Sequence, residues 1–221
     1  MKKLIRGIVE FRKNVQSEYR ERFAHLALGQ APDTLFIACS DSRVVPNVFA
    51  SADPGDLFVI RNVGNLIAPA DENGISVSDE SEGAAIEFSV LKLGVRDIIV
   101  CGHSECGAMQ AALGGAIAKD SPHLRSWLRH AEDALARLRH DTSPDPSLLP
   151  HNRLSQINAI CQREHLLTYP AVRRARDAGR LRLHSWWFDL AHADVHAYDE
   201  RQGRFIRIDE TSADSLLQQL T

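Results

Sequence analysis

The sequence predicts an α/β fold, with a central, mostly parallel β-sheet flanked by helices, an N-terminal helical arm and a C-terminal edge strand. Short apolar runs at 34–39, 56–61 and 96–101 are each bounded by Gly, Pro, Asp or Asn, which is typical of fully buried strands. Residues 81–94 follow a helical pattern that stops at Gly94. A strand, a helix and a strand in this order predict parallel neighbours joined by a right-handed crossover.

Residues 1–30 are predicted to form the helical arm. Apolar residues recur there at every third or fourth position with charges between them, at Leu4, Ile8, Phe11, Val15 and Tyr19. A single apolar face needs something to cover it. Two interpretations stay open: the arm packs on its own domain, or it lies across a partner subunit.

Later segments complete the α/β core over residues 31–221. Apolar stripes predict helices at 123–140 and 152–168, separated by the Pro-containing segment 141–150, and a further helix at 171–179. The chain then continues with three strand-like runs, 181–190, 194–199 and 204–208.

Length and charge indicate one domain, residues 1–221, and argue against a nucleic-acid partner. The 221 residues are enough to bury a sizeable core without disulfides. Lys and Arg total 26 against 29 Asp and Glu, a net charge of -3, and no basic block stands out. We therefore expect a small-molecule or protein partner.

The chain is expected to be cytoplasmic and not membrane-bound. Charged residues interrupt the apolar run near Met1 before it reaches the length of a signal peptide, and no stretch is long enough to span a membrane. The 4 cysteines of such a chain are better interpreted as thiols or metal ligands than as disulfides.

Two of the apolar runs end in residue types that bind metals, and ligand sites of parallel sheets lie at such strand ends. The first run ends at Cys39, and the third leads into His103 and Cys106 at the start of a helix. Two sulfurs and one nitrogen with one position open are a known ligand arrangement for catalytic zinc.

The segment CGHSECGAMQ (101–110) has a second interpretation, because Ser104 lies where the G-x-S-x-G elbow of serine hydrolases has its nucleophile. Cys106 replaces the last glycine of that motif, which weakens this alternative. A non-catalytic zinc protein is a further rival. It would keep the ligands without using an open position.

Each cysteine and histidine also has a purely structural interpretation. Cys39 can be a small apolar residue at a strand end, and His103 an ordinary loop histidine. We interpret Cys101 and Cys161, which have no such neighbours in the sequence, as packing residues of a strand and a helix.

Asp41 and Arg43 follow the first candidate ligand directly and also allow two interpretations. They can form an ordinary surface ion pair. Alternatively, Asp41 either occupies the open zinc position or is held away from it by Arg43 and accepts a hydrogen bond from zinc-bound hydroxide.

Both motifs, CSDSR (39–43) and GHSECGA (102–108), resemble those of the β-class carbonic anhydrases, in their plant-like branch. The likeness continues through DLFVIRNVGNL (56–66), GAAIEFSVLKLGV (83–95) and HSWWFDLAHADVHAYD, so it spans roughly residues 28 to 200. The two short motifs together are highly specific.

The resemblance implies a zinc lyase that reversibly hydrates CO2 to bicarbonate and a proton, through attack of zinc-bound hydroxide on CO2. It implies that Cys39, His103 and Cys106 hold one Zn2+ per subunit and that Asp41 and Arg43 form a catalytic pair beside the metal, with Asp41 on the metal only in a closed state.

The resemblance also implies a substrate pocket and an assembly. Gln30, Phe58 and Phe88 match positions that bind substrate, although both phenylalanines can equally be core residues. A homodimer or higher homo-oligomer such as a homotetramer is implied, with the arm on the partner. Phe36 and Ala38 depart from the Trp and Gly of a bicarbonate-regulated branch, which predicts an open site with Asp41 on Arg43.

Overall fold

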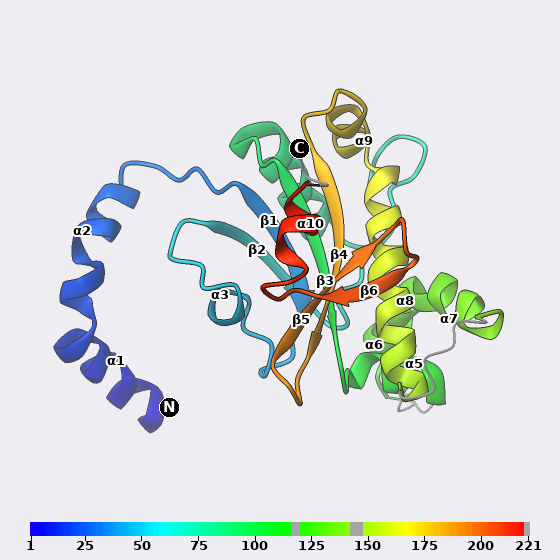
Figure 1. Cartoon of the computed structure of the whole chain (residues 1–221), viewed down its shortest axis with the longest axis horizontal. Helices are drawn as coiled ribbons and strands as arrows, with labels where there is room; N and C mark the ends of the chain where they lie inside the picture. The colour runs from blue at the N-terminus through cyan, green and yellow to red at the C-terminus, as the bar shows by residue number, and fades with distance from the viewer. Residues whose placement is uncertain (116–119, 142–147, 219–221) are drawn as a thin grey trace.

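A six-stranded sheet forms the centre of the fold in a computed structural model, which describes residues 1–115, 120–141 and 148–218 (Figure 1). Its strand order is β2-β1-β3-β4-β5-β6. The first four of these strands are parallel, and β5 and β6 are antiparallel. The strands are β1 (Thr34–Cys39), β2 (Leu57–Asn62), β3 (Asp97–His103), β4 (Arg182–Asp189), β5 (Asp194–Asp199) and β6 (Arg204–Arg207). The predicted fold class, including the C-terminal edge strand, is confirmed.

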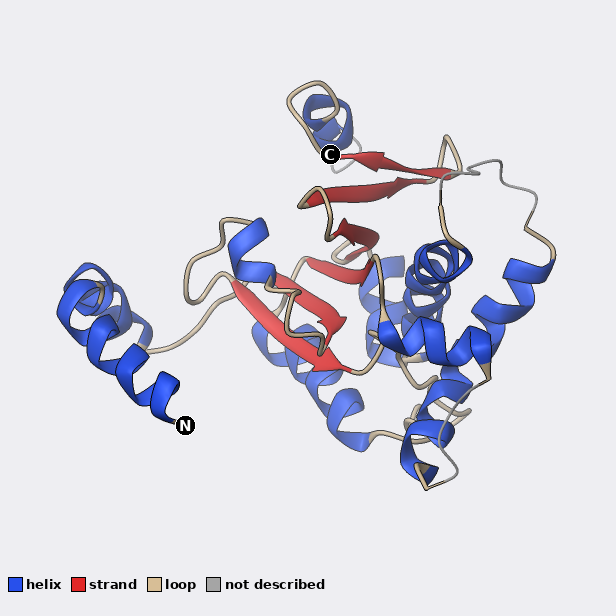
Figure 2. Cartoon of the chain, turned by 90° about the horizontal axis from the view of Figure 1, so that it is seen from below, coloured by secondary structure: helices blue, strands red, loops and turns tan. Residues whose placement is uncertain are grey.

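Helices lie on both sides of the twisted sheet (Figure 2). They are α1 (Lys2–Asn14), α2 (Gln16–Leu26), α3 (Pro46–Phe49), α4 (Glu80–Phe88), α5 (Gly107–Gly114), α6 (Pro122–Trp127), α7 (Glu132–Arg139), α8 (Pro150–His165), α9 (Pro170–Asp177) and α10 (Ala213–Gln218). In the part of the chain that the structure describes, no helix combines the length and the hydrophobicity that a membrane span requires.

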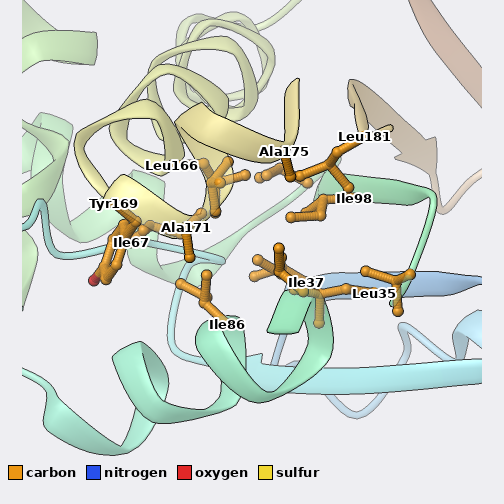
Figure 3. Close-up of a cluster of buried hydrophobic side chains, with 14 residues drawn as sticks. Leu35, Ile37, Ile67, Ile86, Ile98, Leu166, Tyr169, Ala171, Ala175 and Leu181 are labelled. Atoms are coloured by element: carbon orange, nitrogen blue, oxygen red, sulfur yellow. The ribbon is translucent and has the colours of Figure 1, made fainter. Parts of the chain in front are cut away.

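Strand β1 is buried on both faces, which explains its uninterrupted apolar sequence. Leu35 and Ile37 point into a cluster with side chains of β3, α4 and α9 (Figure 3), while Phe36 and Ala38 enter a second cluster on the other face. The predicted burial is confirmed for β1 and β3. It is wrong for β2, because β2 is an edge strand in which Val59 and Arg61 are exposed and no residue is fully buried.

Several predicted helices have the expected positions but change geometry along their length. The helix expected at 81–94 becomes a π-helix, η1 (Ser89–Leu93), before Gly94 ends it with a φ of 67°. The helix expected at 123–140 is interrupted by a 3₁₀ turn, η2 (Leu128–Ala131), and α8 continues into another, η3 (Leu166–Thr168). Residues 142–147 of the predicted break lie outside the described residues. Helix α10 was not predicted.

The arm extends away from the sheet as α1 and α2, which meet at Val15 and contain no buried residue (Figure 1). Arg22 anchors α2 to the core through Asp53 at 2.7 Å and Asp56 at 2.8 Å. Large apolar side chains remain exposed on α1, including Leu4 and Ile8 at 66% and 62%. Helix α1 therefore does not pack on the described core of its own chain, whereas α2 contacts it, and the arm's place across a partner subunit stays a prediction.

Candidate active site

The candidate site lies where β1 and β3, which are neighbours in the sheet, reach their carboxyl ends. Cys39 is the last residue of β1 and His103 the last of β3. The register pairs Ala38 with Cys101, so both strands end at the same edge of the sheet. Ligand sites of parallel α/β sheets form at this edge.

Cys39, His103 and Cys106 form a group suited to a metal ion. Their sulfur and nitrogen ligand atoms all lie within 4.8 Å of one another, and all three residues are buried. Tetrahedral bonds of about 2.0–2.3 Å place ligand atoms roughly 3.5–3.8 Å apart, so a small inward movement completes such a site. Among the described residues, this group is the only set of its kind.

The orientation of His103 leaves one ring nitrogen available to a metal. Its Nδ1 lies 2.8 Å from the carbonyl oxygen of Ser104, while its Nε2 is buried and makes no hydrogen bond to the described residues. A metal-binding histidine commonly donates its second N–H to a backbone carbonyl, and a buried nitrogen without any partner is costly. Ser155 of α8 fixes the backbone, accepting from His103 N at 3.1 Å and donating to His103 O at 2.8 Å.

A strained turn at Glu105 brings Cys106 back toward His103. Glu105 has a φ of 54°, which is unusual for a residue other than glycine. Asn152 of α8 stabilises this turn from both sides, because its Oδ1 accepts from Glu105 N at 2.7 Å and its Nδ2 donates to Glu105 Oε1 at 3.0 Å. The turn ends at Cys106, the N-cap of α5.

The two thiols influence each other. A hydrogen bond with Cys106 lowers the pKa of Cys39, and the Gly64 N–H, 3.3 Å from Cys39 Sγ, lowers it further against the effect of burial. The same contact, together with burial, raises the pKa of Cys106, which the N–H groups at the start of α5 partly offset. The site therefore favours a thiolate at Cys39, the form that binds metals.

Asp41 and Arg43 form a bidentate ion pair beside this group. Arg43 Nε donates to Asp41 Oδ1 at 2.9 Å and Arg43 Nη2 to Oδ2 at 2.7 Å. This contact holds the pKa of Asp41 far below its usual range. Arg61 of β2 braces the same backbone, donating to Cys39 O at 2.6 Å and to Asp41 O at 2.7 Å. Arg61 was not among the predicted site residues.

Ser104 has a structural role that does not suit a nucleophile. Its Oγ accepts a hydrogen bond from Leu190 N at 2.8 Å and donates one to Asp189 Oδ1 at 3.4 Å. The neighbouring imidazole of His103 faces the Ser104 carbonyl and not its hydroxyl. Ser104 thus ties the turn to the end of β4, and the serine-hydrolase alternative gains no support from this geometry.

The three expected substrate residues lie away from the metal group of their own chain. Phe58 and Phe88 are together, with ring centroids 5.9 Å apart, and Phe88 is 45% exposed. Phe58 pairs with Leu35, however, four residues before Cys39, which corresponds to roughly 13 Å along a strand. Gln30 is exposed between α2 and β1.

A cavity of about 750 Å³ lies elsewhere, between the sheet and α10. Ile99, Trp186, Ala197 and Leu216 are among the residues that line it. None of the predicted site residues does so. This cavity therefore does not supply the expected substrate pocket.

The supporting residues were harder to predict than the ligands. Asn152 and Ser155 are ordinary polar residues of a helical pattern, and nothing in their spacing shows that they face the site. The segment Asn62-Val63-Gly64-Asn65 carries a turn signal that does mark an irregular loop after β2. Glu82 contacts that loop from the first turn of α4, accepting from Asn62 Nδ2 at 2.7 Å and from Ala68 N at 3.2 Å.

Glu82→Gln is expected to change how the free energy of unfolding depends on pH. Burial raises the pKa of Glu82 to about 8 in the folded chain, whereas the unfolded chain releases this proton near the ordinary value of 4.5. The free energy of unfolding of the wild type therefore falls as pH rises between these two values. Gln resembles the neutral acid and removes this contribution.

Urea unfolding of both proteins at about pH 5 and about pH 9 measures this effect, and the two pH dependences should differ on the order of a few kcal/mol. Identical pH dependences in the wild type and the variant would show that Glu82 is ionised in the folded chain.

Comparison with known proteins identifies the relatives of this chain. The sequence pattern of the family described as "Carbonic anhydrase" matches residues 34–195. The carbonic anhydrase of Pseudomonas aeruginosa is 40% identical over 211 residues, which cover 95% of this chain and 93% of the relative. Carbonic anhydrase 1 of Escherichia coli O157:H7 is 38% identical over 208 residues, covering 93% of this chain and 91% of the relative.

Solved structures give the same result. The β-carbonic anhydrase CcaA superimposes with a TM-score of 0.85 at 37% identity, covering 94% of this chain and 99% of that one. A tetrameric β-carbonic anhydrase of Sordaria macrospora superimposes with a TM-score of 0.72 at 27% identity, covering 89% of this chain and 97% of that one.

Proposed function

The chain belongs to the carbonic anhydrase family, in its β class, and on this premise we propose that it reversibly hydrates carbon dioxide to bicarbonate and a proton at the group Cys39, His103 and Cys106. The observation that carries the proposal is the convergence of these three ligand atoms within 4.8 Å, with His103 Nε2 buried and without a hydrogen bond to the described residues.

The three residues fit zinc, one ion per chain, with a fourth position left to a water molecule. Zinc held in this way supplies a nucleophile near neutral pH, because it lowers the pKa of water to about 7. The side chains of His103 and Cys106 are fixed for this task by the turn at Glu105, and Cys39 by its place at the end of β1.

Asp41 positions the attacking water and Arg43 positions Asp41. Because Arg43 engages both carboxylate oxygens, Asp41 stays ionised at neutral pH and would be held off a metal bound by the three ligands. Its oxygens remain acceptors for a hydrogen bond from the water that attacks CO2. We propose that the site is open at neutral pH, as in the plant-like branch, and Phe36, which packs against Phe49 and Trp186, accords with this assignment.

A second copy of the chain completes the substrate pocket in this proposal. Gln30, Phe58 and Phe88 are too far along the sheet to reach the metal group of their own chain, but Gln30 and Phe88 are exposed and β2 is an edge strand. The apolar rings of Phe58 and Phe88 suit CO2, and the amide of Gln30 suits one of its oxygens.

We further propose that the arm holds the copies together in a homodimer or higher homo-oligomer. The solved relative of Sordaria macrospora is tetrameric. The exposed apolar side chains of α1, which include Leu4, Ile8 and Phe11, need a partner surface that their own chain does not offer in its described part. A cytoplasmic location and a single-domain organisation stay predictions.

Removal of residues 1–29 is expected to leave the core folded and to reduce the oligomer to smaller species. The arm buries no residue of its own, so the core loses little packing. Light scattering measures the mass of the truncated chain beside the full chain. Ile8→Glu should weaken the oligomer in the same direction, and Lys13→Glu serves as its control on the same helix. An unchanged mass in the truncated chain contradicts the proposed role of the arm.

Stopped-flow CO2 hydration by the zinc-loaded protein, followed with a pH indicator from about pH 6.5 to 9, tests the function. Fast hydration that persists at the acidic end is expected from an open site. A rate that collapses below about pH 8 would place Asp41 on the metal. No hydration at any pH in this range, with zinc bound, rejects the function.

A further inference from the structure

The loop of residues 63–68 follows β2 and forms no regular secondary structure, yet its residues 64–68 are buried beside the metal group. Side chains satisfy most of its backbone groups, as they must when water is excluded. Three carbonyl oxygens accept hydrogen bonds from side chains: Val63 O from Trp127, Gly64 O from Asn158 and Ala68 O from Tyr169. Two N–H groups donate to side chains, Ile67 N to Gln162 and Ala68 N to Glu82. Both backbone groups of Leu66 pair with the side chain of Asn62. The position of this loop is therefore set by distant helices.

Gly64 is the point at which this loop touches the metal group. Its N–H donates to Cys39 Sγ at 3.3 Å. Its φ is +84°, and a Cβ atom at this position would lie 2.9 Å from Ala108 Cβ and 3.3 Å from Met109 Cε. Only glycine allows the backbone to approach the sulfur this closely.

Asn158 of α8 holds the other side of Gly64. It is fully buried, and its Nδ2 donates to Gly64 O at 3.1 Å. Its Oδ1 accepts from Gln162 Nε2 at 2.9 Å, which fixes the amide orientation, and Gln162 Oε1 accepts from Ile67 N at 2.7 Å. Asn158, oriented by Gln162, thus holds Gly64 by its carbonyl, while Trp127 holds Val63 O, the carbonyl of the peptide unit that carries the Gly64 N–H.

We propose that Asn158 is a positioning residue of the metal site, which holds Gly64 where its N–H reaches Cys39 Sγ and thereby tunes the bond between this sulfur and the metal. The inference rests on the proposed function as a zinc site. A hydrogen bond to sulfur withdraws electron density from it, so the sulfur donates less charge to the metal. In a site with two thiolates this leaves the metal a stronger Lewis acid, which favours an acidic water at neutral pH.

The hydrogen bond itself is tested in the wild-type protein loaded with 113Cd. A scalar coupling between the cadmium nucleus and the Gly64 amide proton, transmitted through Sγ, is the expected result. Its absence overturns the proposal, even in a protein that hydrates CO2 rapidly. If the coupling is present but the zinc protein has no activity, the proposed function fails while the hydrogen bond stands.

Asn158→Leu tests the positioning role, with Gln156→Leu as its control, because Gln156 is buried on the same helix but bonds to Arg153. The Asn158 variant should lose the coupling, and because the loop then no longer orients the Cys39 sulfur, it should bind zinc about 10-fold more weakly. The sulfur-to-metal charge-transfer band of its cobalt form should move to lower energy, because a sulfur without the hydrogen bond is easier to oxidise. A folded Asn158 variant with unchanged band, coupling and zinc affinity rejects the proposal, and an equal shift in the control also rejects it.

Discussion

Cys106→Ala is expected to lose zinc and to slow CO2 hydration by about 10³-fold or more, since the metal supplies the nucleophile. Cys106 contributes one of the three ligand atoms that lie within 4.8 Å of one another. Removing its sulfur leaves one Cys and one His, too few protein ligands to retain zinc in a catalytic site. Metal analysis of the purified protein and stopped-flow hydration measure the two effects.

Cys161→Ala is the matched control for this experiment. Cys161 is buried in the same hydrophobic cluster as Cys106 but lies on α8 and is not a member of the metal group. Its replacement removes a sulfur from the core and should lower the free energy of unfolding by about 1 kcal/mol, with zinc and activity retained. Full zinc content and full activity in Cys106→Ala would contradict the assigned ligands.

Asp41→Asn is expected to retain zinc and to lower kcat/KM about 10²-fold, the loss typical of a removed acid–base or hydrogen-bonding group. Asn keeps the size of the side chain and one acceptor for Arg43. It loses the charge and the second acceptor with which, in the proposed mechanism, Asp41 orients the attacking water. Stopped-flow hydration with parallel metal analysis separates loss of turnover from loss of metal.

Asp177→Asn provides the control for this variant, because Asp177 also pairs with a neighbouring arginine, Arg176, at 2.8 Å, but on the exposed end of α9. Its activity should equal that of the wild type. If Asp41→Asn were as active as the wild type, Asp41 would have no part in turnover.

The elements that the sequence predicted best are those whose pattern reflects burial on both sides. β1 and β3 are interior strands of the sheet, so both faces demand apolar residues and the runs are uninterrupted. The run of β2 looked the same in the sequence, yet in the chain alone β2 is an edge strand with Val59 exposed. Sequence pattern does not separate burial within a chain from burial against another chain.

The metal group was predictable because Cys and His are rare, chemically specific and located at strand ends. The residues that support this group were not predictable, because Asn152, Ser155 and Asn158 belong to α8, far along the chain, and are common polar residues. Only packing α8 on β3 reveals that their side chains face Glu105, His103 and Gly64. Residue type and spacing carry no trace of such contacts.

The expected substrate residues are a second case in which sequence does not show where a side chain lies relative to the metal group. Phe58 and Phe88 do lie together, as a shared pocket requires, but away from the metal group of their own chain. In the proposed assembly a second copy of the chain delivers these residues, and a sequence motif does not record which copy does so. Gln30, at the junction of the arm and the core, belongs to the same case.

The proposed function is tested most directly by removing the metal from the wild-type protein and returning zinc in steps while CO2 hydration is followed by stopped flow. Hydration should be absent without metal, rise in proportion to added zinc and stop rising at about one ion per chain, as expected for a single site with three protein ligands. A protein that binds one zinc ion per chain and still fails to hydrate CO2 would contradict it, and so would hydration that does not depend on zinc.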